Sequence, residues 1–288
     1  MMQINCLGKI LDLSQPQVMG ILNLSPFSFA AVGRHVNLDD ALRYAEQMTA
    51  EGAAIIDVGG EPSNPGVHPI ISLQQELDRV IPVVEALAKR IAIPLSIDTS
   101  KAAVMREAIS QGAGFINDVR ALREPEALTV VAETQVPVCL MHMSFPDGCP
   151  PAALANQPDD TLLQEVSHFL ASRVDACRKA GIRRDKILLD PGIGGGSFGK
   201  NLTGNLTLLS NLTDFASLGF PLLIGVSRKA FIGELLQVPV EDRLYGSLAA
   251  ATVAVLNGAN LIRAHDVKAT VHAVKIAAAI RAQQTLFI

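Results

Sequence analysis

Eight short apolar runs recur along the chain, and this repetition constrains the fold more than any other feature of the sequence. The runs occupy residues 18–24, 54–58, 94–97, 115–119, 137–141, 186–189, 221–226 and 261–264. Each is almost continuously apolar, which is typical of strands buried on both faces of a parallel sheet. The intervening segments have helical periodicity, as in 39–51, where Ala41, Leu42, Ala45 and Met48 recur on one face.

Eight strand-then-helix units in 288 residues predict a single α/β domain, a (β/α)8 TIM barrel spanning residues 1–288. A doubly wound open sheet is the main alternative, because periodicity alone does not reveal closure of the sheet. Hydrophobic residues make up 49% of the chain and charged residues 18%, which is enough for a large core. The longest irregular stretch is 144–158, and a proline-containing stretch at 239–242 interrupts the seventh crossover helix.

The net charge of −4 gives no general attraction to nucleic acid or to an anionic membrane. The four cysteines, Cys6, Cys139, Cys149 and Cys177, form no C-x-x-C pair, so we interpret them as reduced packing residues rather than a zinc site. We see no leader peptide and no apolar run near the roughly 20 residues of a membrane helix. Together these features predict a cytoplasmic protein.

Polar groups follow nearly every apolar run. In a barrel, residues just past the carboxyl ends of the strands converge on one face, where the active site lies. The groups delivered there are Asn23, Ser25, Glu61, Asp98, Asn117, Asp118, His142, Asp190, Ser227, Lys229, Arg263, His265 and Asp266. Asp98, Asp118 and Asp266 fit equally well as caps of the following helices. Arg263 and Lys229 cannot be amino-terminal caps, so the whole set favours a binding site.

These groups fall into two chemical sets. Asp98, Asn117 and Asp190 suit the edge of a planar heterocycle, since a carboxylate facing an amino-amidine edge makes paired, charge-assisted hydrogen bonds. Arg263, His265 and Asn23 suit a phosphate-like group, with arginine as a bidentate clamp and the asparagine oxygen as a magnesium ligand. A helix predicted to begin near Ser227 offers backbone N–H groups to an anion. The site is therefore predicted to bind a flat ring and an anion.

The stretch "DPGIGGGSFGKN" approaches the P-loop pattern G-x-x-x-x-G-K, because Gly194 is followed by Gly199 and Lys200. A P-loop requires Ser or Thr after the lysine for magnesium, and Asn201 stands there instead. We favour a loop whose glycines allow an unusual backbone and which lays Phe198 against a bound ring. An ordinary core position for Phe198 is the alternative.

Nine stretches together resemble the dihydropteroate synthases, a family of pterin-binding barrels. They are "VMGILNLSP", "IIDVGGE", "SIDTSK", "INDVRAL", "VCLMHM", "LLDPG", "GVSRK", "GSLAAA" and "IRAHDV", which run from the first strand to the eighth. The resemblance implies condensation of 6-hydroxymethyl-7,8-dihydropterin pyrophosphate with 4-aminobenzoate, giving 7,8-dihydropteroate and pyrophosphate. It also implies a transferase of folate biosynthesis that is a sulfonamide target.

The resemblance also assigns roles to residues of this chain. It implies that Lys229, Asp98, Arg263 and His265 are catalytic and that Asn23, Arg263 and His265 bind pyrophosphate with Mg²⁺, Asn23 being the metal ligand. The pterin would contact Asp98, Asn117, Met141, Asp190, Gly225 and Lys229, and the aminobenzoate would contact Ser63, Phe198 and Ser227. The implied partners are these small molecules. We also expect a homodimer, because barrel proteins often dimerise through late helices and the apolar, alanine-rich segment 249–256 permits such a contact.

The sequence departs from the family pattern mainly in the first two substrate loops. Phe27 and Ala31 replace two acids, Asn64 replaces an arginine, and Ala230 replaces a serine. We predict an active enzyme with altered loop ordering and altered affinity for aminobenzoate; a catalytically weak pterin-binding homologue is the alternative. A related folate-to-corrinoid methyltransferase has no use for "SRK" and "IRAHD". A metal-dependent hydrolase needs a histidine pair on one strand, which the chain lacks.

Overall fold

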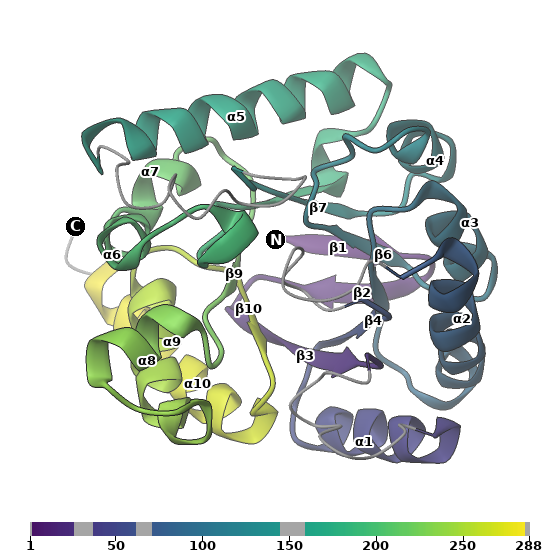
Figure 1. The fold of residues 1–288 in the computed structure, drawn as a ribbon, viewed down its shortest axis with the longest axis horizontal. Helices are drawn as coiled ribbons and strands as arrows, with labels where there is room; N and C mark the ends of the chain where they lie inside the picture. The colour runs from purple at the N-terminus through teal and green to yellow at the C-terminus, as the bar shows by residue number, and fades with distance from the viewer. Residues whose placement is uncertain (1, 26–36, 62–70, 145–158, 286–288) are drawn as a thin grey trace.

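Eight parallel strands form a barrel surrounded by helices in the computed structural model, which describes residues 2–25, 37–61, 71–144 and 159–285 (Figure 1). In sheet order they are β8 (Ile187–Asp190), β7 (Val138–Met141), β6 (Phe115–Asp118), β5 (Leu95–Asp98), β4 (Ile55–Gly59), β3 (Gln17–Asn23), β10 (Leu261–Ala264) and β9 (Leu223–Gly225).

The two ends of this order meet, so the sheet closes on itself. A parallel bridge joins Leu189 to Leu222, and the Leu189 N–H donates to the Pro221 carbonyl at 2.9 Å. The first strand of the barrel pairs directly with the last, β3 with β10. The predicted barrel is therefore confirmed, and an open doubly wound sheet is excluded.

Helices follow the strands in the predicted alternation. Their bounds are α1 (Leu38–Ala50), α2 (Leu73–Arg90), α3 (Ala102–Ser110), α4 (Ala127–Thr134), α5 (Asp159–Lys179), α6 (Leu202–Ser210), α7 (Leu212–Ala216), α8 (Ala230–Leu236), α9 (Leu244–Leu256) and α10 (Val267–Thr285). The face predicted for 39–51 is buried in α1, which begins after Asn37, whose side chain caps the Asp40 N–H. Val240–Arg243 forms a 3-10 turn that separates α8 from α9, as the proline there predicts. No helix in the described ranges is long and apolar enough to span a bilayer.

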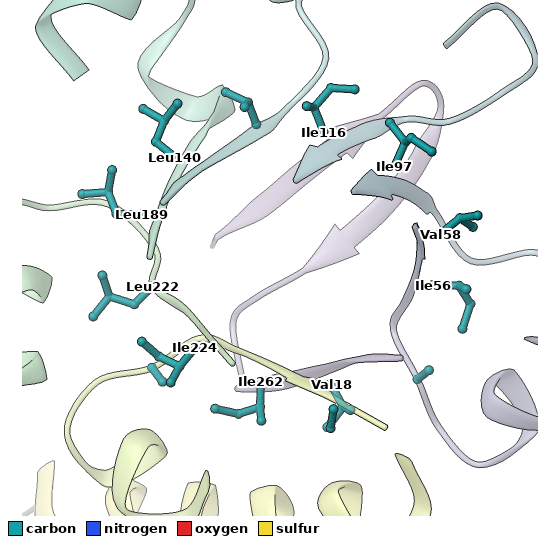
Figure 2. Packing of buried hydrophobic residues seen from close by; sticks show 14 of the residues in the cluster. Val18, Ile56, Val58, Ile97, Ile116, Leu140, Leu189, Leu222, Ile224 and Ile262 are labelled. Atoms are coloured by element: carbon teal, nitrogen blue, oxygen red, sulfur yellow. The ribbon is translucent and has the colours of Figure 1, made fainter. Parts of the chain in front are cut away.

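Side chains along each strand alternate between the helices and the barrel interior. Figure 2 shows the outward set, which includes Val18, Ile56, Ile97, Leu140 and Ile262 and belongs to the main core. The inward residues at the amino-terminal ends of the strands are also apolar. They are Met19, Ile55, Phe115, Cys139, Leu188, Leu223 and Leu261. This inner layer fills the barrel with side chains, as the strand period of two requires.

An amino-terminal hairpin, which the sequence analysis did not predict, closes the end of the barrel at which the strands begin. Strand β1 (Gln3–Cys6) pairs antiparallel with β2 (Lys9–Asp12). The turn residues Leu7 and Gly8 have φ angles of 53° and 89°, as a two-residue hairpin turn requires. Ile4, Cys6, Leu11 and Leu13 pack against the apolar inner layer. The inward-facing side chains at this end are therefore apolar, and the inward-facing polar side chains described below lie towards the opposite end.

Candidate functional site

The inward positions become polar two residues further along the same strands. Asp57 follows Ile55 on β4, Asn117 follows Phe115 on β6, and Asp190 follows Leu188 on β8. On β10 the inward residue after Leu261 is Arg263, and on β5 Ser96 and Asp98 face inward. Because the strand period is two, advancing two residues along β4, β6, β8 or β10 moves from the apolar inner layer to a polar one. This polar layer is the candidate active site.

Asp57 is the centre of the polar layer and is fully buried. Its Oδ2 accepts from Arg263 Nε at 2.6 Å and from Asn117 Nδ2 at 3.0 Å. Its Oδ1 accepts from Ser96 Oγ at 2.5 Å. A terminal nitrogen of Arg263 also donates to Asp98 Oδ2 at 2.7 Å. The guanidinium therefore joins two carboxylates from neighbouring strands.

The charges in this network shift one another's protonation. Burial raises the pKa of Asp98 to about 7; Arg263 opposes that rise, and Asp57 adds to it. Burial lowers the pKa of Arg263, but the attraction of Asp57 and Asp98 outweighs it, so the pKa is raised overall. Arg263 stays charged, whereas Asp98 lies near its midpoint at neutral pH. A carboxyl poised in this way is typical of ligand-binding and catalytic sites.

Asp190 and Lys229 lie beside this network. Asp190 Oδ1 accepts from the Gly192 N–H at 2.7 Å, and burial raises the pKa of its carboxyl. Lys229 Nζ donates to the Ile193 carbonyl at 2.7 Å and lies 4.3 Å from the centre of the Phe198 ring. Burial lowers the pKa of Lys229 to about 8, with Asp190 opposing the shift. The ammonium is thus held over an aromatic face, where it gains a cation–π attraction.

The glycine-rich loop after β8 places Phe198 in this site. Gly192 has φ 75°, and a Cβ there would lie 1.9 Å from the His142 carbonyl oxygen; a Cβ at Gly194 would lie 2.1 Å from the Phe198 ring. Phe198 packs against Met141 and Met143 in a small cluster separate from the main core. Phe198 is thus a buried packing residue of a small separate cluster, and its contact with a bound ring stays a prediction.

The lysine of the P-loop-like pattern does not face open solvent. Lys200 is 2% exposed, and its Nζ lies 2.8 Å from His142 Nδ1. An ammonium enclosed by protein groups in this way does not serve as the phosphate-binding lysine of a P-loop. The rejection of the P-loop stands.

His265 and Ser227 meet at the rim formed by β9 and β10. Ser227 Oγ lies 3.0 Å from His265 Nδ1 and accepts from the His265 N–H at 3.1 Å. Burial, and then Arg263, lower the pKa of His265 to about 4, so its imidazole is neutral at pH 7. The helix predicted near Ser227 begins only at Ala230, because Arg228 has a φ of 54° that helical backbone cannot adopt. That part of the prediction was wrong.

Several polar residues after the strands accept hydrogen bonds that hold the backbone. Asp266 accepts two hydrogen bonds of 2.8 Å from Arg228 and fixes its left-handed backbone. Asp118 accepts from the Leu122 N–H at 2.7 Å and the Arg120 N–H at 2.8 Å. Asn23 Oδ1 accepts from the Ser25 N–H at 2.8 Å. The alternative of a cap-like role therefore describes Asp118 well.

Lys101, from the "DTSK" stretch, ties two other motifs together. Its Nζ donates to Glu76 Oε2 at 2.6 Å and also to Glu61, which ends the "DVGGE" stretch. Glu76 is fully buried, and burial raises the pKa of its carboxyl. This ion pair anchors the chain immediately before residues 62–70.

The structure brings together most of the predicted site residues at one end of the barrel. These are Asn23, Asp98, Asn117, Met141, Asp190, Phe198, Gly225, Ser227, Lys229, Arg263 and His265. Gly225 pairs with Arg263 in the sheet. Ser63 and the divergent loop residues Phe27, Ala31 and Asn64 lie outside the described residues.

Sequence reasoning missed Asp57, Ser96 and Lys200. It considered the carboxyl-terminal ends of the strands and the residues after them, whereas Asp57 and Ser96 each lie two residues before the end of their strand. A carboxylate inside the apolar run "AAIIDV" was the available signal, because a charge buried in a strand must have a partner. Lys200 was considered only as a P-loop lysine.

Comparison with known proteins agrees with this geometry. The family model of pterin binding enzymes matches residues 19–265, which cover the barrel from β3 to just beyond β10. The chain therefore belongs to the pterin-binding enzyme family.

Within that family, its relatives are dihydropteroate synthases. The enzyme of Escherichia coli (strain K12) is 49% identical over 269 residues, 93% of each chain. A Yersinia pestis dihydropteroate synthase, solved with a sulfonamide drug complex, is 48% identical with a TM-score of 0.90 and covers 97% of this chain and 99% of its own. The Xanthomonas albilineans enzyme in complex with 7,8-dihydropteroate is 43% identical with a TM-score of 0.86, and the same shares are covered.

Proposed function

We propose that this chain condenses 6-hydroxymethyl-7,8-dihydropterin pyrophosphate with 4-aminobenzoate, forming 7,8-dihydropteroate and releasing pyrophosphate. The observation that carries the proposal is the polar layer of Asp57, Asp98, Asn117 and Arg263 at the open end of a pterin-family barrel. Buried carboxylates and an amide at this position match the donor-rich edge of a pterin.

The pterin ring lies between Asp98, Asn117 and Asp190 on one edge and Lys229 on another, with Met141 and Gly225 lining its slot. A ring bound there displaces little water, because Asn117 and Asp190 are already 4% and 6% exposed. Lys229 is charged below about pH 8 and donates to an acceptor atom of the ring. Fixed donors and acceptors in a dry site orient the methylene carbon for attack.

Arg263, His265 and Asn23 form the pyrophosphate end of the proposed site. With Ser227 donating to Nδ1, the neutral imidazole of His265 carries its proton on Nε2 and donates it to a phosphate oxygen. Arg263 adds a permanent positive charge. Both groups stabilise the negative charge that develops as the pyrophosphate leaves.

Mg²⁺ is proposed as the cofactor, and the donor set fits a metal brought in with the substrate. The described residues contain no cluster of three or more acidic, histidine or cysteine side chains that would form a resident metal cage. Asn23 Oδ1 accepts one hydrogen bond and has a second lone pair for a cation, and Mg²⁺ commonly takes one or two protein ligands plus phosphate oxygens. When bound, the ion neutralises charge on the leaving pyrophosphate.

The aminobenzoate is proposed to contact Phe198 and Ser227; Ser63, the third residue that the resemblance implies, lies outside the described residues. Its amine is neutral at pH 7 and attacks the methylene carbon without a strong general base, so the protein contributes mainly by positioning. Good positioning supplies roughly 7–11 kcal/mol. Sulfonamides are proposed to compete for the same place, which makes the chain a sulfonamide target.

We further propose a cytoplasmic homodimer. Val253 on α9 and Ile276 and Ile280 on α10 are 41%, 64% and 45% exposed. Helices α9 and α10 pack against each other, and their exposed apolar residues fit a self-complementary face. Light scattering of the purified protein tests this: a particle of twice the 30.6 kDa chain mass supports the dimer, and a particle of one chain mass contradicts it.

Pyrophosphate release tests the proposed reaction. The purified protein receives the pterin pyrophosphate and Mg²⁺, with or without 4-aminobenzoate. Release that requires aminobenzoate and disappears in Asp98→Ala and Lys229→Ala supports the synthase, with the exposed Lys268→Ala on α10 as the control. Pterin binding without turnover would instead favour the weak pterin-binding alternative and implicate Phe27, Ala31 and Asn64.

A further inference from the structure

A second buried lysine, Lys200, lies beside the proposed pterin site and has no part in the contacts proposed above. It is 2% exposed, and its Nζ lies 2.8 Å from His142 Nδ1 and 3.4 Å from the His142 carbonyl oxygen. His142 is itself 2% exposed and packs edge-on against Phe169 at 4.9 Å between ring centres. Removing an ammonium from water costs several kcal/mol, so its placement here needs a compensating role.

The surroundings of this lysine connect it to Asp190. Burial lowers the pKa of Lys200 to about 7; Asp190 opposes this shift and Lys229 adds to it. Burial, followed by Lys200 and Arg123, lowers the pKa of His142 to about 2, so its ring is neutral and accepts from the lysine. The backbone N–H of His142 donates to the backbone carbonyl of Asp190 at 2.9 Å.

The same lysine closes the glycine-rich loop. The Lys200 N–H donates to the Gly194 carbonyl at 3.2 Å, and a Cβ built on Gly192 would lie 3.2 Å from Lys200 Nζ. Gly192 holds the Asp190 carboxylate, and the loop carries Phe198. The loop is therefore tied to the end of β7 at a point next to the groups that face the ring.

We propose that Lys200, acting through His142, is a positioning residue that holds the Asp190 carboxylate and the Phe198 ring in their binding orientation. This inference rests on the proposed function. Lys200 makes no contact with the substrate; it acts by fixing the loop between β8 and α6 against β7. The chain offers a matched comparison in Lys9, whose Nζ donates to the Ile91 carbonyl at 2.7 Å and the Ala88 carbonyl at 3.4 Å at the other end of the barrel.

The experiment compares Lys200→Met with Lys9→Met. Calorimetry measures the Kd for 6-hydroxymethyl-7,8-dihydropterin pyrophosphate, steady-state assays measure kcat and KM, and thermal unfolding measures Tm. We expect Lys200→Met to raise the Kd and the pterin KM about tenfold or more, while Lys9→Met lowers Tm and changes the Kd by less than about twofold.

His142 supplies the rescue test. The His142→Asn side chain retains an acceptor oxygen close to the place of Nδ1, whereas the His142→Leu side chain has no acceptor. We expect His142→Leu to reproduce the loss of affinity and His142→Asn to recover most of it. This pair decides the question if Lys200→Met fails to fold.

A Kd that stays at the wild-type value in Lys200→Met, or equal affinities in His142→Asn and His142→Leu, overturns the inference and leaves a purely structural ion contact. Absence of pterin binding by the wild-type protein overturns the proposed function and this inference with it. Wild-type binding therefore separates the two failures.

Discussion

The two ends of the barrel are built on the same eight strands but have opposite chemistry. At the amino-terminal end, Ile55 and Phe115 meet the hairpin residue Leu11 in a fully buried apolar layer. At the carboxyl-terminal end, Asp57 and Asn117 meet Arg263 in a network of hydrogen bonds. On β4, β6, β8 and β10 the two layers are separated by only two residues.

This contrast shows how one barrel separates stability from function. The apolar layer gains free energy from burial, at roughly 25 cal/mol per Å² removed from water. The polar layer keeps charges out of water, which costs free energy unless each charge has a partner. The apolar layer is therefore expected to determine folding stability, and the polar layer to determine ligand binding.

The largest expected effect comes from comparing two variants on one strand, β6, one in each layer. Phe115→Ala empties part of the apolar layer and should lower the free energy of unfolding by about 3–5 kcal/mol. Its kcat/KM, measured per folded molecule, should stay near the wild-type value. Asn117→Ala, two residues later, should weaken pterin binding with a smaller loss of stability. Urea unfolding and steady-state kinetics check both; a large loss of kcat/KM in folded Phe115→Ala would break the comparison.

The next effect concerns the arginine of the polar layer. Arg263→Met leaves Asp57 and Asp98 without their shared cation and removes the proposed donor to the leaving pyrophosphate, so kcat/KM should fall by roughly 10²–10³-fold. Arg184→Met is the control from the amino-terminal end of the barrel, where Arg184 Cζ lies 4.1 Å from the centre of the Phe220 ring. Equal losses of kcat/KM in the two variants would contradict the assignment.

The sequence predicted the barrel because its signal is repeated eight times. Strand ends lie within two residues of the predicted ones: the run 261–264 is observed unchanged, and the run 54–58 is observed as Ile55–Gly59. The hairpin was missed because alternation over four residues is too short to identify a strand, and because apolar Leu7 lies in the turn and apolar Ile10 is exposed on β2. Closure was invisible to periodicity and depends on the Leu189–Leu222 bridge.

The site was predictable where a polar residue ends an apolar run, as Asp98 and Asp190 do. It was not predictable where the partner is distant in sequence: Asp57 and Arg263 are separated by 206 residues, and only the closed barrel brings them together. The coupling of Lys200 to His142, 58 residues away, is hidden for the same reason.

A smaller effect is expected at the boundary between the layers, at Ser96. Ser96→Ala removes the hydroxyl that donates to Asp57 Oδ1 and should cost about 1.5–3 kcal/mol of unfolding free energy, with a loss of pterin affinity. Cys139→Ala, in the adjacent apolar layer, removes a side-chain atom of similar size and should affect stability alone. Chemical unfolding with pterin calorimetry measures both quantities, and unchanged affinity in Ser96→Ala would place Ser96 with the structural layer.

The smallest expected effect is a pH dependence of kcat/KM that arises from the polar layer and not from the apolar layer. Burial lowers the pKa of Lys229 from 10.5 to about 8, so its ammonium is present below pH 8 and is lost as pH rises. If the charged form binds the pterin, kcat/KM should fall about tenfold per pH unit above pH 8. Folding stability changes in the opposite direction with pH. Because the pKa is lower in the folded protein, Lys229 contributes stability above pH 10.5, and this contribution is lost as pH falls through 8.

Lys229→Arg is the control, because arginine keeps its charge at all these pH values. The fall of kcat/KM above pH 8 should be absent in this variant, even though its activity is lower. If kcat/KM of Lys229→Arg still falls above pH 8, the titrating group is the substrate or another residue, and Lys229 does not cause the pH dependence.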